Sequence, residues 1–406
     1  MGGEVRTRIQ RIRSVAQTLL LQALVLVGLA SLPAAPARAD ELRRMAPFIR
    51  PLLMGDAYVA VGDEDSTVFY NPAGIARLPQ GTVTTLGAQF ILDDLTKQAL
   101  TDPDAISAKY QNLSPSQFRD LLGTRAFVDL GLPLLTYARP GYAWGIVTEG
   151  LTNVQVLGNP ILPGLHLEVH GDAIGYMTLA TKLGEDLAIG VTPKVVYRVG
   201  LDKVFTFGEL FAGGSTLNLD NQPDFKNLKA GVFYTVPGVD VGAIWNLPFG
   251  RSWQPRVGVS ALNIGGYDDK AGVTGMEFGK RPTPFDQPIG GELPQINTVG
   301  FAVSPIYAGV RYTVALDFVD VTQSVLPGTS LELRTRLGTE VGLGVRDDGT
   351  ALFSILGGWN AGHVSAGVLA RVWIFQVGFG QYTVEEGQKP GDDPSTRTVF
   401  LFSFRF

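Results

Sequence analysis

The sequence predicts an all-β protein that closes into a transmembrane antiparallel β-barrel, and three observations lead to this fold class. Apolar and polar residues alternate along segments that are long for strands, glycine makes up 50 of the 406 residues, and phenylalanine occupies every second position at the end of the chain. Alternation with a period of two is the pattern of a strand with one apolar face. Charged residues amount to 17%, against about 25% in ordinary soluble proteins.

Residues 1–39 match a signal peptide that is removed on export. An arginine-rich start, a short apolar stretch at 19–32 and the small-x-small sequence Ala37-Arg38-Ala39 form this pattern. We predict cleavage near Ala39 and location in the cell outer membrane, with an uncleaved membrane anchor as the alternative. Beyond residue 39 no apolar run approaches the ~18 residues that a transmembrane helix needs.

Sixteen segments carry the alternating pattern, and each is a candidate strand. They are 82–92, 125–138, 142–156, 165–183, 186–199, 203–218, 227–236, 239–247, 255–265, 296–304, 306–321, 329–346, 350–359, 363–371, 374–384 and 396–406. The patterns of 203–218 and 227–236 are weak. An even number of strands agrees with the closure of a bacterial barrel.

Charged residues and glycines share one face of these strands and apolar residues the other. A soluble β-sandwich would also alternate, but the length of the segments and the crowding of glycine on the polar face favour a barrel with a narrow lumen. We therefore expect the charged residues of the polar face to point into the lumen. These are Arg311, Asp317, Glu332, Arg334, Arg336, Glu340 and Arg371.

Short turns alternate with long connections along the chain, as in bacterial barrels with periplasmic turns and external loops. The connection 93–124 contains a helix start, because Ser114-Pro115-Ser116-Gln117 combines an N-cap with a capping-box glutamine. Phe118, Leu121 and Leu122 line one face of that helix. This face is either an outer landing surface for a lipid-like ligand or, as we favour, a contact with the barrel rim.

The last strand ends in Phe400, Phe402, Phe404 and Phe406 on one face. It resembles the terminal strand of bacterial outer-membrane proteins, which the barrel assembly machinery reads. We expect Phe404 and Phe406 to act as the sorting signal, with outer-membrane lipid and the assembly machinery as partners.

Composition argues against catalysis, metal binding and nucleic-acid binding. The chain has no cysteine, three histidines and a net charge of −5, whereas a nucleic-acid partner requires a basic face. His166 and His170 lie about 13 Å apart along a strand, too far to share a metal. The sequence His363-Val364-Ser365-Ala366-Gly367 lacks the first glycine of a nucleophile elbow, and these spacings do not predict an acid–base pair. We expect no enzyme activity, no catalytic residue, no metal and no cofactor.

A motif before the first strand resembles the N-terminal motif of FadL-like and PorV-like outer-membrane proteins. It combines glycine and alanine with an acidic cluster and an Asn-Pro-Ala-Gly turn, and Thr67 departs from the small residue usual there. Its residues are Gly55, Ala57, Asp63, Glu64, Asp65, Asn71, Pro72 and Gly74. The C-terminal third is also similar, from Gly357-Gly358-Trp359-Asn360 onward, so the resemblance covers both ends of the mature chain.

The resemblance implies a 14-stranded barrel at 82–406 whose segment 40–81 folds into the lumen as a hatch, although our own count is sixteen. The acidic cluster would pair with Arg311, Arg334, Arg336 or Arg371. The function implied is passive uptake of hydrophobic small molecules, fatty-acid-like or aromatic. The alternatives are a PorV-like protein that holds or shuttles secreted partners through the loop 266–295, and a structural barrel without transport.

Overall fold

The computed structural model describes residues 44–46, 48–110, 113–157, 163–211, 231–234, 238–250, 252–265, 274–275, 283–284, 293–346, 349–387 and 389–406. The predicted signal peptide and most of the loop 266–295 lie outside these residues.

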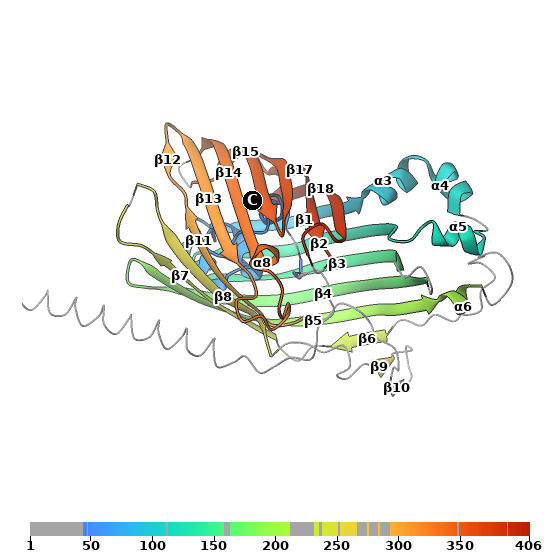
Figure 1. Ribbon diagram of the computed structural model, residues 1–406. Coiled ribbons are helices and arrows are strands. Elements are labelled where there is room, and N and C mark those ends of the chain that lie inside the picture. The colour runs from blue at the N-terminus through green and yellow to red at the C-terminus, as the bar shows by residue number, and fades with distance from the viewer. Residues whose placement is uncertain are drawn as a thin grey trace, which may run out of the picture.

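Fourteen strands of the described chain close into an antiparallel barrel (Figure 1). They are β1 (Thr82–Asp93), β2 (Arg125–Arg139), β3 (Tyr142–Leu157), β4 (Gly164–Leu183), β5 (Leu187–Thr206), β7 (Gly238–Asn246), β8 (Arg256–Ile264), β11 (Ile296–Val303), β13 (Val310–Phe318), β14 (Thr335–Val345), β15 (Ala351–Asn360), β16 (His363–Val372), β17 (Phe375–Glu385) and β18 (Pro394–Arg405). The barrel closes because β1 pairs with β2 on one side and with β18 on the other.

The remaining described elements are short. Four small strands, β6 (Gly231–Tyr234), β9 (Thr274–Gly275), β10 (Thr283–Pro284) and β12 (Ile306–Tyr307), add to the same sheet. The helical elements are α2 (Ile49–Leu53), η1 (Asp65–Phe69), η2 (Pro72–Arg77), α3 (Asp94–Thr101), α4 (Pro103–Tyr110), α5 (Pro115–Arg119), α6 (Phe207–Leu210) and α8 (Leu331–Arg334). Among the described helices, none combines the length and the apolar character needed to cross a membrane.

The count of sixteen strands was too high, and the two weak candidates account for the difference. The first four residues of 203–218 belong to β5, which ends where Thr206 caps α6. Within 227–236 only β6 is described as a strand, and it pairs with β5 beside the main ladder. Period-two alternation alone does not show whether a segment begins a new strand or continues the previous one.

Long connections gather at one end of the barrel and short turns at the other. In Figure 1, β1 to β5 extend toward the end that carries α3, α4, α5 and α6. We call this the loop end. The opposite, turn end carries the β2–β3 and β4–β5 turns and the chain terminus Phe406. In bacterial barrels short turns face the periplasm, which orients the turn end.

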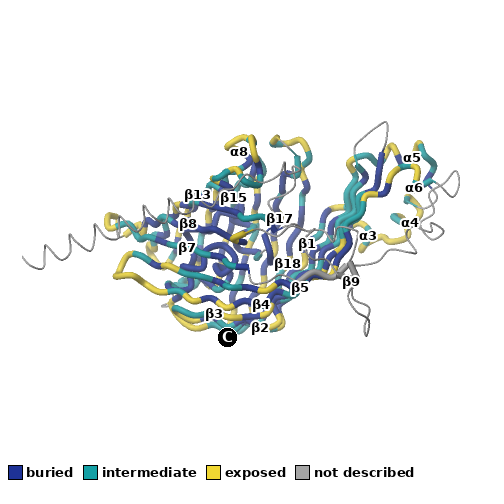
Figure 2. The backbone as a smooth tube through the Cα atoms, turned by 90° about the horizontal axis from the view of Figure 1, so that it is seen from below, coloured by how far each residue is buried: buried dark blue, intermediate teal, exposed yellow. Residues whose placement is uncertain are grey.

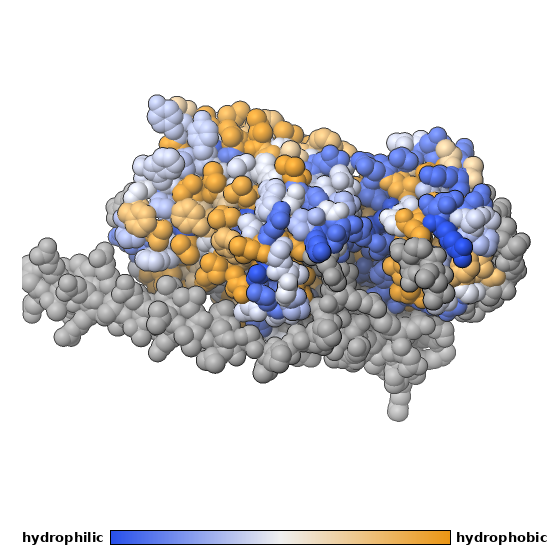
Figure 3. Space-filling view, viewed as in Figure 1, coloured by the Kyte–Doolittle hydropathy of each residue, from blue (hydrophilic) through white to orange (hydrophobic). Residues whose placement is uncertain are grey.

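The outer wall of the barrel is apolar, as a surface in contact with lipid must be. On β3, Trp144 and Ile146 point outward and are exposed, whereas Ala143, Gly145 and Val147 between and beside them are buried. The same alternation runs along β17 and β18, where Phe379 and Phe400 stack across the strands with their ring centres 5.0 Å apart. Apolar residues accordingly gather over the barrel body in Figure 3.

The N-terminal segment, by which we mean described residues 44–46 and 48–78, fills the inside of the barrel. It contains α2, η1 and η2, and nearly all of its residues are buried (Figure 2). α2 contacts β15 to β18, while η2 contacts β4, β5 and β7 on another side of the wall. The lumen is therefore occupied by the protein's own chain.

Glycines on the inner wall provide the space for this segment. A Cβ atom on Gly358 would lie 2.1 Å from the backbone nitrogen of Gly55, and one on Gly258 would lie 2.4 Å from the carbonyl oxygen of Val59. A Cβ atom on Gly242 would likewise lie 2.0 Å from the side-chain oxygen of Asn71. Real Cβ atoms do not approach other atoms this closely, so any side chain here would push the segment off the wall. The high glycine content thus has a structural cause.

Candidate functional site in the barrel lumen

The motif residues hold the N-terminal segment in its fold. Asn71 caps η2 by accepting a hydrogen bond from the Ala73 nitrogen, and Pro72 occupies the first position of that helix. The Asn71 side-chain amide also donates to the carbonyl oxygen of Val59 within the segment at 2.9 Å and to that of Ala243 on β7 at 3.1 Å. One buried asparagine therefore ties the segment to itself and to the wall.

Small residues of the same motif allow close packing. A Cβ on Gly74 would lie 2.2 Å from the Thr67 hydroxyl, and the Thr67 hydroxyl donates to the Asn71 carbonyl oxygen at 2.9 Å. Gly55 has a φ of +62° and lies between the backbones of β14 and β15. Ala57 is fully buried. Larger residues at these positions would not fit.

Asp317 on β13 anchors the segment from the wall. Its carboxylate accepts hydrogen bonds from the backbone nitrogens of Tyr58 at 2.7 Å and Val59 at 2.9 Å. On β16, three strands further along the wall, the Ser365 hydroxyl donates to the carbonyl oxygen of Leu53 at 3.0 Å and accepts from the Gly55 nitrogen at 3.1 Å. These contacts satisfy backbone groups of an irregular chain that would otherwise be buried without partners.

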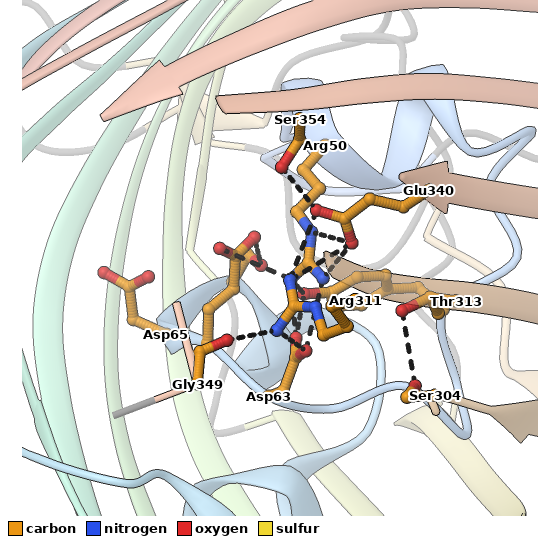
Figure 4. Close-up of polar contacts among 12 residues, drawn as sticks. Arg50, Asp63, Asp65, Ser304, Arg311, Thr313, Glu340, Gly349 and Ser354 are labelled. Carbon is orange, nitrogen blue, oxygen red and sulfur yellow. Dashed lines mark hydrogen bonds and ion pairs between the residues drawn. The ribbon is translucent and has the colours of Figure 1, made fainter. Parts of the chain in front are cut away.

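Arg50 on α2 is the centre of a buried charge network (Figure 4). Its guanidinium contacts Asp63 within the segment and Glu340 on β14, both at 2.5 Å. Arg311 on β13 contacts the same two carboxylates, each at 3.2 Å. The Ser354 hydroxyl donates to Glu340 at 2.6 Å. Because two arginines share two carboxylates across the boundary between segment and wall, the network fixes one position of α2.

The other two acidic residues of the motif extend the network toward the turn end. Glu64 accepts from Arg371 on β16 at 2.7 Å, and Asp65 accepts from the Thr84 hydroxyl on β1 at 2.9 Å. Arg405 lies 3.4 Å from Asp65. The acidic cluster therefore contacts wall strands on both sides of the pairing between β1 and β18, which closes the barrel.

The arginine partners keep the carboxylates of Asp63 and Glu64 ionised. Burial raises the pKa of Glu64, but the Arg50, Arg371 and Arg405 guanidiniums outweigh it and lower that pKa to about 2. The pKa of Asp63 also falls well below its ordinary value, because Arg50 and Arg311 outweigh burial. A carboxyl group whose pKa is lower in the folded than in the unfolded protein stabilises the fold at any pH above its unfolded pKa, about 4. This stabilisation is lost as the pH falls toward 2, where the carboxyl becomes protonated in the folded protein too. The network should thus persist in mildly acidic medium.

The charged residues that we expected in the lumen lie in different places in the structure. Arg311, Asp317, Glu340 and Arg371 are buried on the inner wall and contact the N-terminal segment. Arg336 is also buried, but it donates to the carbonyl oxygen of Leu333 at 2.6 Å and lies away from the acidic cluster.

For Glu332 and Arg334 the expectation was wrong. The segment 331–334 forms the helical turn α8, which Ser330 caps, and β14 begins only at Thr335. Glu332 is exposed, and Arg334 donates to the Asp320 carbonyl oxygen at 3.5 Å. Arg50 was missed, and its signal was a single arginine within the apolar run Phe48-Ile49-Arg50-Pro51-Leu52.

An apolar sector of the inner wall runs from the loop half of the barrel to the N-terminal segment. It is formed by inward residues of β1, β2, β3, β17 and β18 that belong to one contiguous buried cluster with Phe48, Phe69 and Leu53 of the segment. The wall residues of this sector are Ile91, Phe127, Leu151, Tyr382, Val384 and Val399. Polar inward residues lie among these apolar ones, since Asp129 pairs with both Ile91 and Leu151, and Glu149 accepts a hydrogen bond from the Ala46 nitrogen.

A second set of ion pairs lies at the loop end, above the apolar sector. Glu386, directly after β17, contacts Arg125 on β2 at 2.6 Å and Arg397 on β18 at 2.7 Å. Asp393 contacts Arg125 at 3.1 Å. The Arg397 guanidinium stacks over the ring of Phe127 at 3.7 Å. The β17–β18 connection is therefore held against β2 beside the outer end of the lumen.

Phe118, Leu121 and Leu122 lie in a small core outside the lumen. Phe118 is buried against α6 and the outward faces of β3 to β5, in a cluster with Leu165 and Phe205. Leu121 and Leu122 pack around this cluster and are half-buried. The arrangement is the rim contact that we favoured, because it seals the apolar face of strands that extend past the barrel body.

The two residues expected to form the sorting signal lie at the turn end. Phe404 packs against Phe375 and Phe402, with ring centres 5.4 Å and 5.2 Å apart. Phe406 is exposed and pairs through its backbone with Val83 of β1. Their role in assembly stays a prediction.

The histidines form pairs with single carboxylates. His166 lies 2.7 Å from Asp202, and His363, which begins β16, lies 2.9 Å from Glu385. Within the ranges that the structure describes, no three histidine, aspartate or glutamate side chains gather in a way that would hold a metal ion.

Replacing Arg50 with methionine is expected to loosen the N-terminal segment. The change removes one of the two arginines that Asp63 and Glu340 share and leaves Arg311, 3.2 Å from each, as their remaining arginine partner. Removing one partner of a buried charge pair costs about 3–5 kcal/mol. Opening of the segment should become at least a hundredfold more frequent, since about 1.4 kcal/mol corresponds to a factor of ten. Hydrogen–deuterium exchange of residues 48–62 measures this. Arg139→Met, at an exposed position of the turn end, is the matched control, and equal protection in both variants would contradict the network's role.

Comparison with known proteins gives solved structures only. No family model and no curated protein matches the sequence. The chain is similar to a TodX monoaromatic hydrocarbon channel variant (10% identity, 89% of this chain and 99% of that one, TM-score 0.48). It is also similar to the toluene transporter TbuX of Ralstonia pickettii (11%, 90% and 99%, TM-score 0.46) and to a FadL homologue of Pseudomonas aeruginosa (10%, 90% and 99%, TM-score 0.41).

Proposed function

We propose that this protein is an outer-membrane channel through which hydrophobic small molecules pass without an energy source, and that the N-terminal segment is its hatch. The observation that carries the proposal is the buried cluster of apolar inward residues between the loop end of the lumen and the segment, although Asp129 and Glu149 face inward among them. An apolar solute can replace side-chain contacts along this sector at little cost, whereas a polar solute would lose its hydration there.

The filled lumen supports a selective channel over a general pore. A barrel of this size without a plug would hold an aqueous passage. Here α2 and the 3₁₀ helices η1 and η2 occupy that space, and polar contacts and ion pairs, which can break and re-form, hold them in place. The hatch is thus able to yield to a ligand and close again.

The geometry of the wall favours exit past the hatch over exit through the side. β1 has a bulge between Thr85 and Ala88, where its pairing with β18 is interrupted. However, a Cβ on Gly87 would lie 2.5 Å from Pro133 and 3.2 Å from Ser403. Side chains of both neighbouring strands therefore fill the bulge.

Replacing Val399 with asparagine tests the apolar sector. Val399 is fully buried on the inner wall, and an amide there should slow the passage of an apolar solute by about tenfold, because an unpaired buried polar group costs ~1–3 kcal/mol. Thr398→Asn is the matched control, because neighbouring residues of a strand face opposite sides and asparagine can still accept the hydrogen bond that the Thr398 hydroxyl accepts from Lys97. Uptake of a labelled long-chain fatty acid and of toluene is measured in Gram-negative cells, because hydrophobic compounds cross plain phospholipid bilayers unaided.

The outcome of this experiment separates the two candidate ligand types and the rival functions. Slower uptake of one compound only would identify its class as the ligand. Equal uptake by Val399→Asn, Thr398→Asn and cells without the protein would contradict transport. A secreted polypeptide that co-purifies with the barrel would then favour the PorV-like partner role.

A further inference from the structure

A pocket at the turn end carries a group of arginines that the proposed channel does not use. Its volume is about 240 Å³, several times that of a water molecule. It lies between the β14–β15 turn, the β16–β17 turn and the chain terminus. Its charged wall includes Arg346, Arg371 and Arg405, and Trp373, Phe375 and Phe406 line its rim.

Among the described residues that line this pocket, the one acidic residue, Asp63, is already bound to other partners. One carboxylate oxygen of Asp63 accepts from Arg50 and from the Tyr58 hydroxyl, and the other accepts from Arg50 and Arg311. None of these three donors lines the pocket. At the terminus, an oxygen of Phe406 accepts from the Val83 nitrogen at 2.9 Å.

The pocket arginines, by contrast, have donors to spare. Each guanidinium carries five N–H groups. Arg346 is exposed and donates a long bond of 3.4 Å to the Arg371 carbonyl oxygen. Arg371 is buried and binds Glu64, yet its Nε has no partner among the described residues. Arg405 lies 3.4 Å from Asp65 and 3.6 Å from Glu64, beyond the length of a strong charged hydrogen bond.

We propose that this pocket binds a phosphate group. Guanidinium forks match phosphate oxygens in pairs, so three arginines around one small pocket form a site for a phosphate ester. The inference does not depend on what crosses the lumen, because the site opens at the turn end and not into the apolar sector.

The rim of the pocket indicates where such a phosphate is found. Trp373 and Phe406 are 79% and 61% exposed, and Trp373 packs edge-on against Phe375 with ring centres 6.3 Å apart. Exposed aromatic rings mark the depth of lipid headgroups in membrane barrels. The phosphate of a lipid headgroup and a free phosphate ester share the chemistry that the arginines recognise, and the experiment distinguishes the two sources.

Native mass spectrometry of the purified full-length mature protein tests the site with three probes. These are phosphatidylglycerol, diacylglycerol with the same acyl chains, and glycerol 3-phosphate. We expect bound phosphatidylglycerol and no bound diacylglycerol. Arg346→Gln should lower the bound fraction about tenfold, the typical effect of losing a charged hydrogen bond. Arg139→Gln, which removes an exposed arginine at the same end but outside the pocket, should leave binding unchanged.

The probes and a second variant assign the source. If glycerol 3-phosphate displaces the lipid and Trp373→Ala binds it as the wild type does, the site takes free phosphate esters. If only phosphatidylglycerol binds and Trp373→Ala weakens it, the site takes a lipid headgroup. Either result supports a phosphate site. Equal binding of phosphatidylglycerol and diacylglycerol, or equal binding by Arg346→Gln and the wild type, would overturn the proposal.

Discussion

Deleting residues 44–76 is expected to turn a closed barrel into an ion-conducting pore, with a conductance in planar bilayers at least about tenfold above that of the wild type. The deletion removes α2, η1 and η2, which fill the lumen and contact strands on several sides of the wall. It leaves the fourteen wall strands and their pairing in place. Removing the chain that fills a barrel of this width leaves room for water and ions.

The deletion needs a check that the barrel still assembles. Heat-modifiable migration on a gel and the far-UV spectrum show whether the strands close. Arg50→Met provides a second test on a complete chain, because it should produce brief conducting events and not a permanent pore. A folded deletion variant with wild-type conductance would contradict the assignment of the N-terminal segment as the hatch.

Replacing Gly358 with valine is expected to displace the N-terminal segment without removing it. The new Cβ would lie 2.1 Å from the Gly55 nitrogen and 2.4 Å from the Met54 carbonyl carbon. The wall cannot give way, since β15 is paired along its length with β14 and β16. We therefore expect the loss of the Arg50 contacts as well, and a more than hundredfold faster hydrogen exchange in residues 48–62.

Gly175→Val is the matched control for this change. Gly175 lies on the outward face of β4, level with the exposed residues Ile146 and Val195, and has no atom within 4 Å of its Cβ position. Valine there adds apolar surface on the lipid side and should leave the segment protected. Equal exchange in Gly358→Val and the wild type would show that close approach to the wall does not position the segment.

The alternation of residue types predicted the barrel well, because each strand has one face toward lipid and one toward the lumen. It failed where a local signal competes with it. Leu331 to Arg334 continue the alternation, yet Ser330 caps a helical turn there and β14 starts later. The alternating pattern also did not show where β5 ends, because the end of a strand is defined by its pairing with a neighbouring strand.

The candidate site was only partly visible in the sequence. The acidic cluster and Asn71 were recognised from the order of residues in one motif, and the structure places them against the wall. Arg50 was not recognised, because a lone arginine has no spacing or partner in sequence. The apolar sector was also missed. It gathers residues from β1 to β3 with residues from β17 and β18, which meet only when the barrel closes.

The most direct test of the central claim compares the uptake of an apolar and a polar solute of equal size in Gram-negative cells. Cells that express the wild type should take up toluene faster than cells without the protein, whereas uptake of the polar solute should be the same in both. Cells with the 44–76 deletion should admit the polar solute as well. If the wild type speeds the uptake of both solutes, or of neither, relative to cells without the protein, the protein is not a hatch-controlled channel for hydrophobic molecules.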